Sequence, residues 1–183
     1  TPSNMVVAVA GKLEHGPIVR QLAGLCEGWK PKPPPSWEPF EDGQVGPRLG
    51  LDYRRTQQVH LSIGLPGLSM TDPDRYALDL LSVILGEGMS SRLFLEVREN
   101  RGLAYDVHSS VVYFRDCGAL IVNAGADPAQ AYTAAEAVAS EIGRLKEGIP
   151  AEEVERGKIL VAGRLLLGME DSRAVAAWMG GQE

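Results

Sequence analysis

The stretch LGEGMSSRLFLEVRENRGLAY, residues 85–105, decides how the second half of this chain folds. A glycine-containing turn leads into a short predicted helix, which a serine caps and which extends to Arg101. Gly102 then supplies a left-handed stop, because glycine adopts positive φ without steric cost. Tyr105 follows at once, at the start of a predicted strand. This reversal can place side chains of the helix and of the strand on one side of the turn.

Outward from this stretch, strands and helices occur in pairs and do not strictly alternate. The hydrophobic periods and the turn and cap residues predict strands at 57–65, 105–113 and 119–126, and helices at 72–86, 127–148, 150–168 and 172–179. This order favours an α+β fold, with an antiparallel or mixed β-sheet covered by helices on one face, over a doubly wound parallel sheet.

The first third of the chain has a different character. A valine-rich run at 4–10 predicts a buried strand, and the periodicity of 14–29 predicts a helix. Six prolines between positions 31 and 47 then exclude a helix and disfavour a central strand. We therefore expect three parts: a strand-helix segment over 1–29, a Pro-rich connector over 30–56, and an α+β domain over 57–183.

Composition and single residues exclude several kinds of site. The formal net charge of −6 argues against a nucleic-acid partner, and no apolar run is long enough to span a bilayer. Cys26 and Cys117 lie far apart and predict two free thiols. None of His15, His60 and His108 has a partner at a zinc-site spacing, so each is interpreted as structural. From its residues alone, the chain contains at most part of an active site.

Within the opening stretch, Arg98 has no obvious partner on its own helix. None of its neighbours three or four positions away on a helix is acidic, whereas Arg92 has Glu96 at the favourable spacing. One interpretation is a cation placed favourably in the last helical turn. The other is that Arg98 and Tyr105 point at one spot, as two donors that stay protonated near neutral pH and suit a carbonyl or a developing oxyanion.

The run GEGMSSRLFLEVRENRGLAY resembles a signature of the pitrilysin family of zinc peptidases, which includes the mitochondrial processing peptidases and insulin-degrading enzyme. Three more runs resemble family segments in the same order: NMVVAVAG, QQVHLSIGLPGLSMTDPDRYALDLLSVILG and GIPAEEVERGKILVAGRLLLGMEDS. The resemblance covers most of the chain. It implies a processing-peptidase-like metallohydrolase fold, in which repeated α+β domains enclose a peptide.

In this family one domain binds zinc through a His-x-x-Glu-His motif, and a later domain facing it supplies an arginine and a tyrosine that hold the peptide. By motif match these two are Arg98 and Tyr105. The chain lacks the zinc motif, so we expect no catalytic or metal-binding residue in it, and zinc in a missing preceding domain or in a partner subunit. Residues 1–29 would be the tail of that zinc-bearing domain, and 57–183 a truncated substrate-facing domain.

The resemblance thus implies the non-catalytic, substrate-holding portion of a zinc-dependent metalloendopeptidase. The expected partners are an unfolded peptide substrate and the zinc-bearing domain or subunit. The alternative is a zinc-less assembly subunit of the same family with a structural role, and a small-molecule-binding α+β domain ranks last. The sequence indicates neither the substrate nor the compartment.

Overall fold

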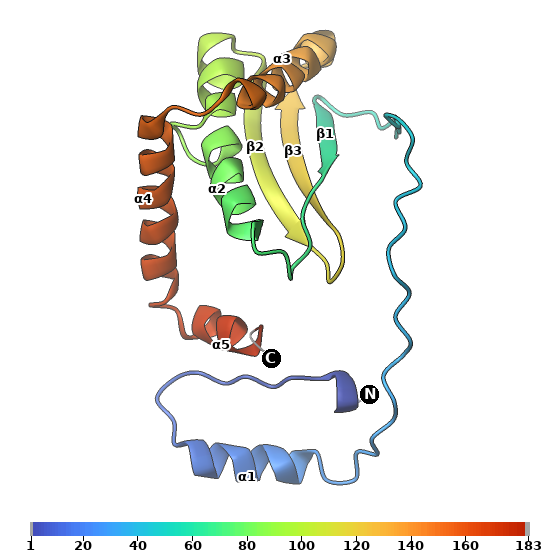
Figure 1. Cartoon of the computed structure of the whole chain (residues 1–183), viewed down its shortest axis with the longest axis vertical. Helices are drawn as coiled ribbons and strands as arrows, with labels where there is room; N and C mark the ends of the chain where they lie inside the picture. The colour runs from blue at the N-terminus through green and yellow to red at the C-terminus, as the bar shows by residue number, and fades with distance from the viewer. Residues whose placement is uncertain (1, 182–183) are drawn as a thin grey trace. The chain divides into compact units, whose positions relative to one another are not determined.

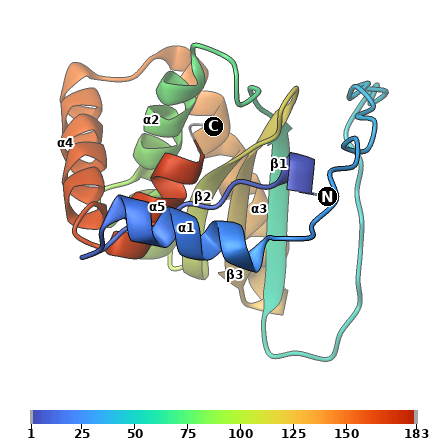
Figure 2. The same cartoon turned by 90° about the horizontal axis from the view of Figure 1, so that it is seen from below.

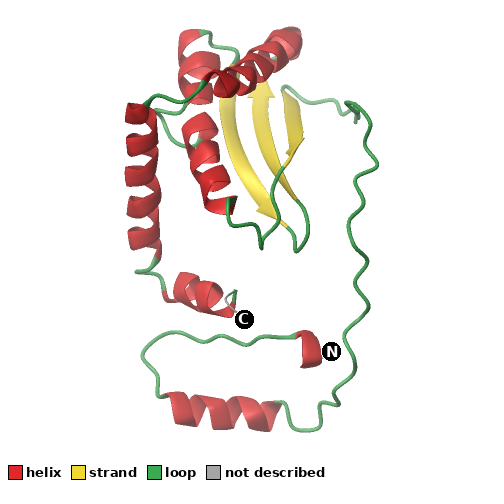
Figure 3. Cartoon of the chain, in the orientation of Figure 1, coloured by secondary structure: helices red, strands yellow, loops and turns green. Residues whose placement is uncertain are grey.

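The computed structural model describes residues 2–181. The chain divides into two compact units: residues 39–161 form one, and residues up to 38 together with those from 162 onward form the other. The long chain between helix α1 (His15–Leu25) and the first strand contains neither helix nor strand (Figure 3). Its prolines account for this irregular backbone, because proline lacks the N–H that a helix or a strand ladder needs.

A three-stranded antiparallel sheet lies at the centre of unit 39–161 (Figure 1). Its strands are β1 (Val59–Pro66), β2 (Ala104–Tyr113) and β3 (Gly118–Ala126), in the order β1-β3-β2. A hairpin joins β2 to β3, and β1 and β2 form the two edges of the sheet (Figure 2). The expectation of an α+β fold with an antiparallel or mixed sheet is confirmed, and the pairing is antiparallel throughout.

One face of this sheet forms the core. Along β1 exposed and half-buried residues alternate, as a strand with one covered face requires. The register continues the covered face across the sheet, so that Ile63, Val122 and Ser109 form one row. Helices α2 (Arg75–Gly86) and α3 (Ala131–Arg144) and the helical segment η2 (Phe94–Asn100) add the rest of the core. Its fully or nearly fully buried members include Leu85, Leu93, Val97, Leu120, Val122, Ala124, Ala126, Ala134, Ala137 and Val138.

Helix α2 approaches β2 unusually closely at Gly86. A Cβ added there would lie 2.5 Å from the backbone nitrogen of Ser109. A hydrogen bond also joins the helix to the strand here, since the Ser109 hydroxyl donates to the Ser82 carbonyl oxygen over 2.7 Å. Only a glycine permits this spacing between helix and strand.

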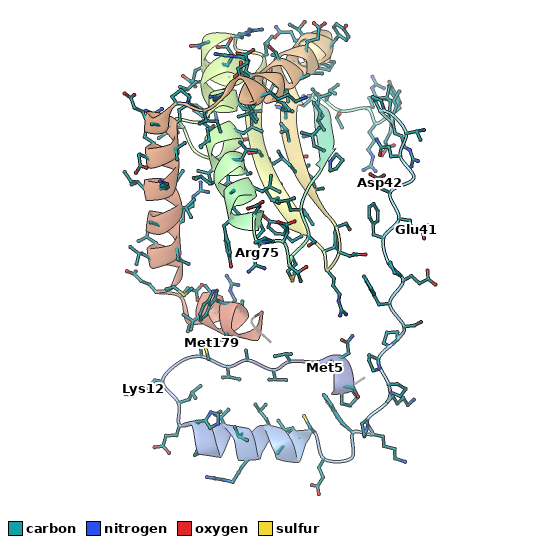
Figure 4. The ribbon with its side chains drawn as sticks, viewed as in Figure 1. Met5, Lys12, Glu41, Asp42, Arg75 and Met179 are labelled. Atoms are coloured by element: carbon teal, nitrogen blue, oxygen red, sulfur yellow. The ribbon has the colours of Figure 1, made fainter. Side chains whose placement is uncertain are left out.

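The start of α2 lies later in the chain than expected. The helix begins at Arg75, not at residue 72, and Asp72 accepts a hydrogen bond from the backbone nitrogen of Asp74. Figure 4 labels Arg75 at the start of α2. Tyr76, in the first turn, is 66% exposed. The guanidinium carbon of Arg75 lies 4.7 Å from the centroid of the Tyr76 ring. This pairing keeps an aromatic ring outside the core.

The predicted long helix over 127–148 is divided into shorter pieces. Asp127 accepts a hydrogen bond from the Ala129 nitrogen and caps the short turn η3 (Pro128–Gln130), which precedes α3. A second short turn, η4 (Leu145–Glu147), ends at Gly148 with a φ of 109°. Helix α4 (Ala151–Gly168) follows, with Glu152 and Glu153 in its first turn, where the helix dipole favours acidic side chains.

The strand expected at 4–10 is wrong for this structure. A short turn, η1 (Pro2–Asn4), is followed by irregular backbone through residue 10. A strand needs a neighbour to satisfy its backbone groups, and all strands within residues 2–181 belong to the three-stranded sheet. Helix α5 (Ser172–Gly180) agrees with the expectation over 172–179. Among the described residues, no helix combines the length and apolarity needed to cross a membrane.

Candidate functional site

The opening stretch forms a π-helix where an ordinary helix is expected. Such segments are rare and frequently occur at functional sites. Their wider turn brings residues five apart into contact, and Glu96 receives hydrogen bonds from Asn100 and from Arg101, the latter at 2.8 Å. These bonds, that from Asn100 first, lower the pKa of Glu96. The expected pair of Arg92 with Glu96 is therefore wrong: Arg92 donates to Glu153 of α4 over 2.8 Å.

Arg98 lies on the exposed side of this π-helix. Its side chain is 44% exposed, and its guanidinium lies 5.0 Å from the centroid of the Phe94 ring. Its Nε is 3.9 Å from a carboxylate oxygen of Glu99, which is a long ion pair in a solvated setting. Two weak contacts thus orient Arg98 and leave its donors open to a ligand.

Gly102 reverses the chain as the sequence predicts. It has a φ of 60°, in the left-handed region. The Leu103 nitrogen donates to the Val97 carbonyl oxygen over 2.9 Å, and the Gly102 nitrogen donates to that of Arg98 over 3.1 Å. These bonds fix the end of the helical segment against the start of β2.

Tyr105 lies in a β-bulge at the start of β2. Ala104 pairs with Ala126 and Asp106 with Gly125, so Tyr105 is the extra residue between them. Bulges often redirect a side chain beside a functional site. Here the bulge leaves both Tyr105 and Asp106 exposed between buried neighbours, and Tyr105 is 59% exposed.

The two predicted site residues thus flank a fixed reversal, one on each element. Within residues 2–181 no hydrogen bond joins Arg98 to Tyr105, and both side chains are accessible. A guanidinium and a phenol hydroxyl in this setting can each donate to oxygens of a ligand. Their joint contact with one ligand stays a prediction.

The uncovered face of the sheet carries polar residues that the sequence interpretation assigned to structure alone. The register forms two rows across the strands, His60–Gly125–Asp106 and Ser62–Asn123–His108. His108 Nδ1 lies 3.0 Å from Asp106 Oδ2. The alternation along β1 could have placed His60 and Ser62 on this face, but only the pairing of β1 with β3 shows which residues lie beside them.

Possible metal ligands do not gather in the described part of the chain. Residues 2–181 contain no group of three His, Cys, Asp or Glu side chains placed to hold one ion. His60 and Asp106, for example, lie on the two strands that flank β3, with Gly125 between them in the same row.

The fold and the site together define a helix-covered antiparallel α+β domain that offers exposed donors and no grouped metal ligands in residues 2–181. A family model described as the peptidase M16 inactive domain matches residues 1–161. The chain belongs to this family, the pitrilysin family expected from its sequence, and corresponds to its inactive domain.

Relatives and solved structures agree with this assignment. An uncharacterized zinc protease of Streptomyces coelicolor is 37% identical over the whole chain, which covers 41% of that protein. One of Mycobacterium tuberculosis is 38% identical, with 43% of its length covered. The chain therefore spans about two fifths of the length of these relatives.

Two crystal structures share the fold. A peptidase M16 inactive domain from Pseudomonas fluorescens has a TM-score of 0.62 at 27% identity, over 69% of this chain and 30% of the other. A protease from Helicobacter pylori has a TM-score of 0.84 at 23% identity, over 94% of this chain and 43% of the other.

Proposed function

We propose that this chain is the substrate-holding, non-catalytic portion of a zinc-dependent endopeptidase. Membership of the inactive-domain family supports the non-catalytic part of this proposal, and the relatives named zinc proteases support the reaction class. The zinc would be held by a preceding domain or by a partner subunit. Bound there, it would supply an activated water for attack on the peptide carbonyl.

One observation supports the holding role most strongly: Arg98 and Tyr105 are exposed on either side of the Gly102 reversal. The Tyr105 hydroxyl would donate to the oxyanion that forms on the peptide, and Arg98 would hold a backbone carbonyl oxygen nearby. The bulge and the π-helix position these two groups without burying them.

The test is Tyr105→Phe in the complete protein that includes the zinc-bearing part. Loss of one oxyanion donor should lower kcat by about ten- to a thousandfold. The matched control is Tyr132→Phe, because Tyr132 is 76% exposed on α3, another element of the domain. Its turnover should equal that of the wild type, and both variants should bind the same amount of zinc.

The outcomes separate this role from the zinc-less assembly subunit. Unchanged turnover in Tyr105→Phe removes Tyr105 from the mechanism. If the complete protein neither binds zinc nor cleaves peptides alone, but activates a zinc-bearing partner independently of Tyr105, the assembly role replaces the proposal.

A further inference from the structure

A hollow lies beside the uncovered face of the sheet, at the point where the chain enters β1. It is shallow and open to solvent, and it is lined by Arg55, Thr56, Gln57, Gln58 and His60. The Thr56 hydroxyl donates to the Gln58 carbonyl oxygen over 2.6 Å and fixes the local turn. All five residues lie in unit 39–161, so the hollow belongs to the same unit as the sheet.

Gly125 lies on the uncovered face of the sheet, next to His60, which lines the hollow. It pairs with His60 on one side and with Asp106 on the other, and it is buried although its row is otherwise exposed. A Cβ at this position would lie 3.5 Å from Gln58 Oε1 and 4.0 Å from His60 Nδ1. Polar atoms of the Gln58 and His60 side chains therefore lie close to the glycine.

The charge of the hollow is opposite to that of the whole chain. Its lining contains one arginine, two glutamines, a threonine and a histidine, and no acidic residue, whereas the formal net charge of the chain is −6. Within residues 2–181 no carboxylate pairs with Arg55. The adjacent Arg54 differs, because it is held by Asp52 over 2.9 Å. Arg55 is thus a cation available to a ligand.

We propose that this hollow is a subsite for an acidic group of a bound polypeptide, a side-chain or terminal carboxylate. This inference rests on the proposed function, because it assumes that an extended peptide lies on the uncovered face. Arg55 supplies the positive charge, and the amide of Gln58 and the imidazole of His60 can supply further donors. The subsite would make peptides with a carboxylate at this register preferred over their neutral counterparts.

The experiment uses this chain and two short unstructured peptides that differ only by Asp against Asn at one central position. Titrations followed by amide chemical shifts in NMR spectra detect weak binding and report where it occurs. The wild-type chain should bind the Asp peptide about two- to fivefold more tightly, the range for one exposed charge pair. The largest shift differences should fall at Arg55, Gln58, His60 and Gly125.

The adjacent arginine provides a matched control. Arg55→Gln should abolish the preference for the Asp peptide, whereas Arg54→Gln should keep the preference, although it removes the same charge. Equal affinity of the two peptides for the wild-type chain, or equal loss in both variants, overturns the subsite. If equal affinity comes with shifts at Tyr105, the proposed function stands without it. If neither peptide binds, the subsite is overturned, and the turnover of Tyr105→Phe in the complete protein decides the proposed function separately.

Discussion

Replacing Gly86 with alanine tests the close contact between α2 and β2. In a helix, alanine is normally better than glycine by about 0.5–1 kcal/mol. Here the new Cβ would lie 2.5 Å from the Ser109 nitrogen and 2.6 Å from the Ser109 hydroxyl oxygen. Overpacking of this kind costs about 1–3 kcal/mol, and displacing the helix also weakens the hydrogen bond from Ser109 to Ser82, worth about 1 kcal/mol. We expect a net loss of about 2 kcal/mol.

Urea denaturation followed by far-UV circular dichroism measures this loss, and amide hydrogen exchange along β3 reports it within the unit that holds the sheet. The matched control is Gly143→Ala in α3, in the same unit, where no atom outside the local helix backbone lies within 4 Å of the added Cβ. That variant should be more stable than the wild type by about 0.5–1 kcal/mol. A Gly86→Ala protein at least as stable as the wild type would refute the packing argument.

Three further variants test single interactions. Gly102→Ala should lose about 1 kcal/mol through backbone strain alone, since φ is 60° and the space around the added Cβ is open, and an unchanged denaturation midpoint would contradict this. Arg92→Met should lose about 1–2 kcal/mol in thermal unfolding by leaving Glu153, only 23% exposed, without its partner, and a loss below a few tenths would show that the pair is merely a surface contact. Burial first, and then the contact with Asp79, raise the pKa of Tyr113 in the folded protein. The stability that its neutral hydroxyl contributes is therefore complete below the ordinary tyrosine pKa near 10, and it is lost as the pH rises through the folded-state pKa. Tyr113→Phe should therefore flatten the decline in stability above about pH 10, and an identical alkaline profile would contradict the assignment.

The regular elements of the sheet domain could be predicted because their signals are local. The alternation of β1 and the glycine at 102 act over a few residues, and each appears where expected. Arg98 and Tyr105 are both exposed, and their joint contact with a ligand stays a prediction.

The remaining features depend on contacts between distant segments. In the π-helix Glu96 accepts a hydrogen bond from Arg101, and Arg92 pairs with Glu153 instead. Spacing rules for ordinary helices could not predict this change of partners. The strand expected at 4–10 has the right residue types but lacks a neighbouring strand within residues 2–181. The polar rows on the uncovered face depend on strand register, which a single sequence does not contain.

Photo-crosslinking from position 105 tests the central claim most directly. The complete zinc-bearing protein would carry p-benzoylphenylalanine in place of Tyr105, or in place of the exposed control Tyr132, and would be irradiated with a labelled peptide substrate. We expect a crosslink from position 105 that excess unlabelled peptide suppresses, and none from position 132. Equal labelling from both positions, or no labelling from position 105 while the peptide is bound, would contradict the claim that Tyr105 contacts the peptide.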